Sequence, residues 1–117
     1  AIPAHYALDV ALDELIEETV AGRIKRYSDA ANFLRDGFKN LGLEFLIPQG
    51  WRSNCLTGLK LPKGIKYEKL HAELKSKGFV IYAGQGNLSE SIFRIANMGD
   101  IKQEELQRLL KVLETVC

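Results

Sequence analysis

Arg94 is the residue of this sequence whose type and position best suit binding chemistry. It lies in the segment FRIANMGDI at 93–101, between the apolar residues Phe93 and Ile95. Because side chains alternate across a strand, Arg94 would point away from the face that Phe93 and Ile95 bury. A guanidinium presents a planar fork of donors that suits a carboxylate or a phosphonate. The same pattern is also typical of a surface charge that protects a strand from aggregation.

The other reactive side chains form no complete site. His5 and His71 stand alone, so they build no Ser-His-Asp or Cys-His arrangement. Cys55 and Cys117 are far apart and have no His or Cys at metal-ligand spacing, which predicts reduced thiols and no zinc site. The glycine-rich loop at 84–87 follows a predicted strand but opens no helix. It therefore indicates a hairpin connection rather than a phosphate cradle.

Composition excludes several classes of protein. Of the 117 residues, 46% are hydrophobic and 26% are charged, as in an ordinary globular domain. A net charge of +1 gives no electrostatic case for nucleic acid or an anionic membrane. No apolar run has transmembrane length and no signal peptide opens the chain, so we expect a cytoplasmic protein. The start without Met, already in a helical pattern, suggests a chain cut from something longer.

Apolar periodicity predicts that the first third of the chain is helical. One apolar pattern runs from Ala4 to about Val20, and a second steps by three and four residues from Ile24 to Leu41. These patterns predict two helices, or one long helix jointed at Gly22. The acidic pair at 17–18 and the basic residues at 23–26 are interpreted as solvated helix faces.

The rest of the chain alternates short strands with helices. Four segments predict strands: 43–47, 55–61, 79–83 and 92–96. A third helix is predicted around Tyr67–Leu74, and a fourth after Asp100, which we expect to be its N-cap. Most links are short and favour antiparallel pairing. The expected fold class is therefore α/β (α+β), with a small, mainly antiparallel sheet of three or four strands, helices on one face and a long or jointed N-terminal helix.

A family resemblance is carried most specifically by residues 78–100. The segments LHAELKSKGFVIYAGQG and FRIANMGDI resemble the C-terminal segment of class V (fold type I) pyridoxal-phosphate-dependent aminotransferases. Within that class they are most similar to the 2-aminoethylphosphonate–pyruvate type, with the alanine–glyoxylate type next. The opening IPAHYALDVALDEL resembles the family's passage from its large to its small domain. The resemblance covers almost the whole chain.

The resemblance implies a domain division and a role for Arg94. Residues 1–22 would leave a large domain that this chain lacks, and residues 23–117 would form the small C-terminal domain. In the family the large domain holds pyridoxal 5'-phosphate through a Schiff-base lysine, and the small domain closes over the substrate. Arg94 matches the family's arginine for the acidic group of the substrate. No catalytic or cofactor-binding residue is expected in this chain, which should be inactive alone.

The implied partners are an amino donor, a 2-oxo acid such as pyruvate, the large domain and a second copy in a homodimer. Ala83, Ala96 and Ile2 depart from the family pattern and leave the exact substrate open. Two alternatives remain: another class V aminotransferase of the alanine or serine–glyoxylate type, and a stand-alone ligand-binding or interaction domain without catalysis. If a large domain is missing, the first helix and the Arg94 face should show uncovered apolar surface.

Overall fold

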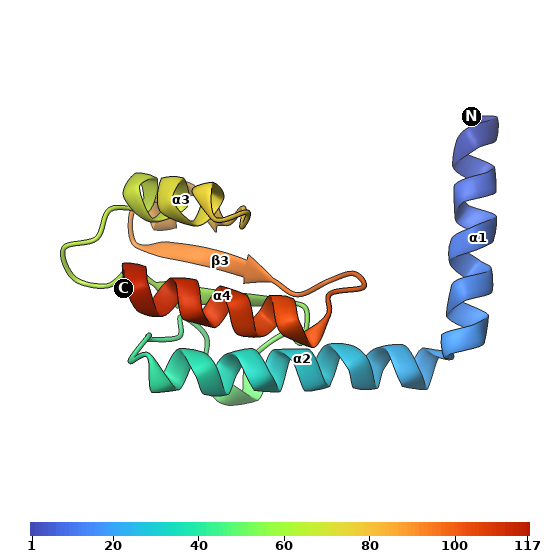
Figure 1. Ribbon diagram of the computed structural model, residues 1–117, viewed down its shortest axis with the longest axis horizontal. Coiled ribbons are helices and arrows are strands. Elements are labelled where there is room, and N and C mark those ends of the chain that lie inside the picture. The colour runs from blue at the N-terminus through green and yellow to red at the C-terminus, as the bar shows by residue number, and fades with distance from the viewer.

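Four α-helices and a small antiparallel sheet form the computed structural model, which describes residues 1–117 (Figure 1). The helices are α1 Ile2–Glu18, α2 Val20–Asn40, α3 Tyr67–Ser76 and α4 Gln103–Val116. The strands are β1 Leu56–Lys60, β2 Tyr82–Ala83 and β3 Ile92–Ala96. Two 3-10 turns, η1 Gln49–Trp51 and η2 Gly86–Leu88, lie in the loops. The expected fold class is confirmed.

Strand β3 lies in the centre of the sheet. The strand order is β1-β3-β2, and both pairs are antiparallel. Arg94 stands opposite Gly58 on β1 and opposite Tyr82 on β2. The predicted hairpin connection is confirmed, since β2 and β3 are consecutive antiparallel neighbours.

One hydrophobic core joins α2, α3 and α4 to one face of the sheet. Phe93 is fully buried and Ile95 is 5% exposed, whereas Arg94 is half-buried and Ala96 is exposed. The alternation predicted for this strand is therefore confirmed, and Arg94 belongs to the face away from the core helices. The largest fully buried side chains of this core are Leu34, Phe38, Leu59, Leu70, Leu74, Phe93 and Leu113.

Two of the predicted strands are shorter than the sequence indicated. Segment 43–47 forms one isolated bridge, between Phe45 and Leu59, supported by a 3.0 Å hydrogen bond from the Leu46 amide to the Gly58 carbonyl. Pro48 follows, and proline has no N–H with which to extend a ladder. Segment 79–83 pairs with β3 only over Tyr82–Ala83.

The joint between the first two helices is at Thr19, so the prediction of a joint at Gly22 is wrong. Thr19 has a φ of 68° and a ψ of 153°, and its hydroxyl accepts the Gly22 amide at 3.1 Å. This side-chain cap allows α2 to begin at Val20, which places Gly22 inside the helix.

Asp100 does not cap α4, so that prediction is also wrong. The helix begins at Gln103, its N-cap is Lys102, and no side chain caps it. The Asp100 carboxylate instead accepts hydrogen bonds from Lys102 Nζ at 2.8 and 2.9 Å. The Asp100 carboxylate is thus paired with Lys102 and does not accept a hydrogen bond from an amide of α4.

Helix α1 stands away from the rest of the molecule (Figure 1). None of its residues is buried, and Leu8, Leu12 and Ile16 are 57%, 48% and 76% exposed. These three residues are spaced by four and share one helix face. The expected uncovered apolar surface on the first helix is confirmed.

None of the helices is both long enough and apolar enough to cross a membrane.

Candidate functional site

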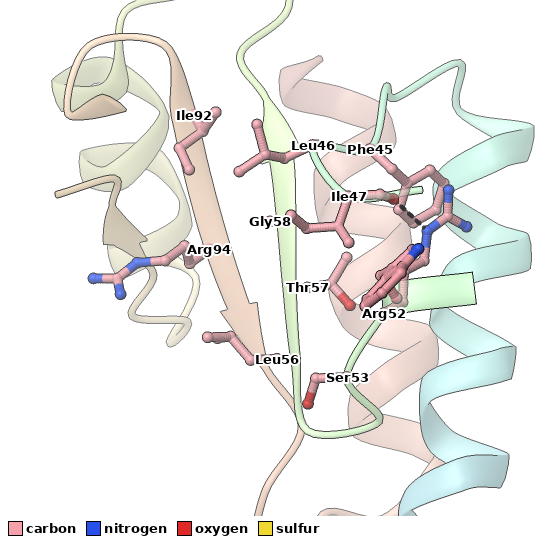
Figure 2. Close-up of a pocket in the computed structure, with 11 residues that line it drawn as sticks. Phe45, Leu46, Ile47, Arg52, Ser53, Leu56, Thr57, Gly58, Ile92 and Arg94 are labelled. Atoms are coloured by element: carbon pink, nitrogen blue, oxygen red, sulfur yellow. Dashed lines mark hydrogen bonds between the residues drawn. The ribbon is translucent and has the colours of Figure 1, made fainter. Parts of the chain in front are cut away.

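Arg94 is fixed at one of its nitrogens and free at the other two. Its Nε donates a 2.8 Å hydrogen bond to the Ala83 carbonyl on β2. Nη1 and Nη2 take part in no hydrogen bond or ion pair within the chain. Figure 2 shows the guanidinium extending from β3 away from β1. A side chain held in this way can offer the N–H groups of both terminal nitrogens to an anion without reorienting.

A groove of about 300 Å³ lies beside Arg94 on the face of the sheet opposite the core helices (Figure 2). Apolar side chains such as Ile47, Leu56 and Ile92 line it, and Arg52 and Arg94 are also among its lining residues. No aspartate or glutamate lines it. With two arginines and no carboxylate among its lining residues, the surroundings of this groove carry a positive charge.

Arg52 is the lining residue that the sequence did not reveal. Its Nε donates to the Ile47 carbonyl at 2.8 Å, and its guanidinium carbon lies 3.8 Å from the centre of the Phe45 ring. The loop between Pro48 and β1 has no apolar period, so nothing in the sequence indicated where this side chain would point. Arg52 is anchored by stacking on the opposite side of the groove from Arg94.

The groove does not by itself fit pyridoxal phosphate. It contains no lysine to hold the cofactor's aldehyde and no carboxylate to pair with its pyridinium nitrogen. Lys60, on the neighbouring strand, is paired with Glu44 at 2.8 Å. The role expected of Arg94 in binding the acidic group of a substrate stays a prediction.

The histidines and cysteines lie outside this groove. His5 Nδ1 is 2.8 Å from the Ala1 carbonyl oxygen, and His71 packs against the Tyr67 ring with 5.6 Å between ring centres. Both cysteines are free, and burial raises the pKa of the Cys117 thiol. No group of three His, Cys, Asp or Glu side chains is placed to hold a metal ion.

Charges at the joint between α1 and α2 form a cluster, so their interpretation as solvated faces is wrong for three residues. Glu18 accepts hydrogen bonds from Arg23 Nε at 2.6 Å and from Arg26 Nε and Nη2 at 2.5 and 3.0 Å. The hydrogen bonds from Arg26 and then Arg23 lower the pKa of Glu18 to about 2. Sequence spacing missed this cluster because its members belong to two helices whose angle depends on Thr19.

Comparison with known proteins relates the chain to aminotransferases. It is 36% identical over 110 residues to an uncharacterized aminotransferase of Methanocaldococcus jannaschii, covering 93% of this chain and 29% of the relative. It is 38% identical over 115 residues to a 2-aminoethylphosphonate–pyruvate transaminase of Bacteroides fragilis, covering 95% of this chain and 32% of the relative. No protein-family model matches.

Solved aminotransferase structures contain the same fold. An alanine–glyoxylate aminotransferase from Nostoc sp. superimposes with a TM-score of 0.90 at 25% identity, over 95% of this chain and 30% of that one. A ureidoglycine–glyoxylate aminotransferase from Bacillus subtilis superimposes with a TM-score of 0.88 at 28% identity. The match covers 95% of this chain and 29% of that one.

The chain is therefore homologous to the C-terminal part of aminotransferases. Its relatives are of the 2-aminoethylphosphonate–pyruvate and alanine–glyoxylate types, as the resemblance of residues 78–100 predicted. The chain spans about a third of the length of the curated relatives it matches.

Proposed function

We propose that this chain is the small C-terminal domain of a 2-aminoethylphosphonate–pyruvate type aminotransferase and that Arg94 binds the acidic group of the substrate. The observation that carries the proposal is the state of the Arg94 guanidinium. It is fastened to Ala83 through Nε, and both terminal nitrogens remain available beside a groove without carboxylates. The similarity to transaminases of this type over about 95% of the chain supports the same assignment.

The contribution of Arg94 is orientation and charge pairing. A carboxylate or phosphonate can accept one hydrogen bond from each terminal nitrogen while the Nε–Ala83 bond stays in place. The guanidinium is then preorganised, so little conformational entropy is lost when the acid binds. Apolar walls such as Leu56 and Ile92 limit the water that would screen this ion pair.

We place pyridoxal 5'-phosphate in the part of the complete enzyme beyond this chain, because the groove beside Arg94 does not fit it. When bound there, that cofactor would supply the chemistry for exchanging an amino group between a donor and a 2-oxo acid such as pyruvate. Residues of this chain bind and orient the acid during both transfers and move no proton themselves.

The proposed division of the chain puts residues 1–22 at the passage from the large domain and residues 23–117 in the small domain. The exposed stripe of Leu8, Leu12 and Ile16 on α1 supports a contact with the missing large domain. The complete enzyme is proposed to be a homodimer. The free thiols of Cys55 and Cys117 support the cytoplasm as its location.

A second candidate is an aminotransferase of the alanine or serine–glyoxylate type. The TM-scores of 0.90 and 0.88 to glyoxylate aminotransferases favour it. Both candidates use Arg94 on an acidic substrate, and they differ in whether the donor carries a phosphonate. Assaying the complete enzyme with 2-aminoethylphosphonate and with alanine separates them. A complete protein that transfers the amino group of neither would support a binding domain without catalysis.

Arg94→Lys in the complete enzyme tests the role of this side chain. Lysine keeps the charge but loses the fork and the Nε anchor, so we expect kcat/KM to fall roughly 10- to 100-fold, as for the loss of a charged hydrogen bond. Arg108→Lys is the matched control, because Arg108 lies on α4 and bonds to Lys77 and Glu105. Equal kinetics for the two variants would return Arg94 to the role of a surface charge.

A further inference from the structure

We propose that Arg26 is a positioning residue, which ties the loop after β3 to the end of α1 and so fixes where β3 holds Arg94. This inference rests on the proposed function of Arg94 and adds a residue far from it in sequence. It assigns a role to charges that the sequence alone presented as a solvated helix face.

Arg26 makes contacts in two directions. On one side, its Nε and Nη2 donate to the two carboxylate oxygens of Glu18, the last residue of α1. On the other side, its Nη1 donates to the backbone carbonyl of Gly99. One side chain on α2 therefore connects the end of α1 with the loop that leaves β3. Figure 1 shows this loop reaching over α2 before the chain enters α4.

The loop itself is fastened at two further points. The Gly99 amide donates to the Tyr27 hydroxyl at 3.2 Å. Asn97, which is 2% exposed, donates through Nδ2 to the Asn54 carbonyl at 2.8 Å and to the Tyr27 carbonyl at 3.4 Å. Asn97 is three residues beyond Arg94, and its own amide pairs with the Cys55 carbonyl beside β1. A displacement of this loop would therefore pull directly on the end of β3.

The joint at Thr19 fixes the position of Glu18, the carboxylate to which Arg26 is paired. Thr19 has a backbone conformation, φ 68° and ψ 153°, that residues other than glycine seldom adopt. Such a conformation persists only where the surroundings over-determine it, and here the pairing of Glu18 with Arg23 and Arg26 does so. Because α1 has no buried residue, Glu18 is its main polar connection to the body. A change in the angle between α1 and α2 would therefore move Arg26 through Glu18, and Arg26 would in turn displace the loop at Gly99.

Arg23 provides a matched control. It donates to the same Glu18 carboxylate at 2.6 Å but forms no hydrogen bond or ion pair with residues 97–100. Arg23→Met and Arg26→Met each remove one guanidinium from Glu18, and only Arg26→Met also releases Gly99. Arg26→Lys is the second variant should Arg26→Met fail to fold, since it keeps a charge but cannot reach both partners.

The experiment measures KM and kcat of the complete enzyme, together with deuterium exchange of the amides at 97–100. We expect Arg26→Met to raise KM for the acidic substrate about tenfold with little change in kcat, as for a small misplacement of a binding group. Exchange at 97–100 should rise in the same variant. Arg23→Met should stay within about twofold of the wild type in KM and leave the exchange unchanged.

A double-mutant cycle shows whether Arg26 acts through Arg94. In an Arg94→Lys background, Arg26→Met should add little to the rise in KM. Fully additive effects, or equal KM and exchange for Arg26→Met and Arg23→Met, would overturn the proposal. If Arg94→Lys alone leaves the kinetics unchanged, the proposed function fails instead. The exchange measurement then still decides whether Arg26 holds the loop.

Discussion

Arg94 is placed by its neighbours in the sheet as much as by its own strand. Gly58, its partner on β1, has no side chain, and Leu46 packs over it, 3.5 Å from where a Cβ would lie. The Nε bond to Ala83 draws the side chain toward β2, where Tyr82 is 65% exposed on the same face. The central strand thus presents one charge that is anchored to a carbonyl of β2 and has two unpaired terminal nitrogens. A guanidinium anchored at Nε, with both terminal nitrogens unpaired, is what the proposed binding role of Arg94 requires.

At the same scale, Glu18 should make stability depend on acid pH. Its pKa is lowered from 4.5 to about 2, so the ionised form favours the folded state. The stabilisation is therefore complete above the ordinary pKa and is lost as pH falls through about 2. We expect Glu18→Gln to be less stable than the wild type at neutral pH, with the difference shrinking between pH 4.5 and 2. Urea unfolding followed by circular dichroism at several pH values measures it.

Glu17→Gln is the control for this effect. It removes a neighbouring carboxylate that forms no ion pair and leaves Glu18 with Arg23 and Arg26. This variant should lose stability with falling pH to the same extent as the wild type. A constant difference in stability between Glu18→Gln and the wild type across the whole pH range would show that ionisation of Glu18 does not stabilise the fold.

At the scale of the element, regular helices and the central strand were predictable, and the joint was not. Apolar residues at steps of three and four predicted α2 and α4 well, because each helix buries one apolar stripe. Leu34 and Phe38 belong to the stripe of α2, and Leu106 and Leu109 to that of α4. The backbone of Thr19 leaves no trace in such periodicity, since a threonine with positive φ looks like any other threonine in sequence. Arg94 could be found because it interrupts an apolar strand. Arg52 and Arg26 could not, because tertiary contacts alone define their roles.

Thr19 has two opposing effects on stability: its backbone conformation is strained, and its hydroxyl caps α2. Its backbone conformation is strained by roughly 1–3 kcal/mol for a non-glycine residue. Its hydroxyl caps α2, and loss of such a cap costs about 1 kcal/mol to alanine but only a few tenths to glycine. We expect Thr19→Gly to stabilise the chain by up to about 1 kcal/mol and Thr19→Ala to destabilise it by about 1 kcal/mol. Denaturant unfolding measures both, and a glycine variant less stable than the alanine variant would contradict a strained joint.

At the scale of the whole molecule, α1 makes the chain more extended than one domain of its length. The radius of gyration is 16.0 Å, compared with about 13 Å expected for a compact domain of this size. The largest dimension, 47 Å, exceeds the other two, 31 and 28 Å. Figure 1 shows that α1 accounts for this shape, since the remaining elements pack around the sheet. The core formed by the sheet with α2, α3 and α4 is therefore complete without α1, whose apolar side chains are exposed.

The exposed apolar stripe of α1 predicts that the isolated chain associates with itself in solution. Ile16, 76% exposed on the stripe with Leu8 and Leu12, should drive self-association as its concentration rises, because burial of apolar surface is favourable at about 25 cal/mol per Å². Ile16→Lys should shift sedimentation velocity profiles toward the monomer. Val80→Lys adds the same charge at a residue 59% exposed outside α1 and should leave association unchanged. In the complete enzyme, Ile16→Lys should instead lower the Tm, since the same stripe would face the large domain. An isolated chain that stays monomeric at every concentration, or equal effects of the two lysines, would mean that α1 is not the apolar contact surface.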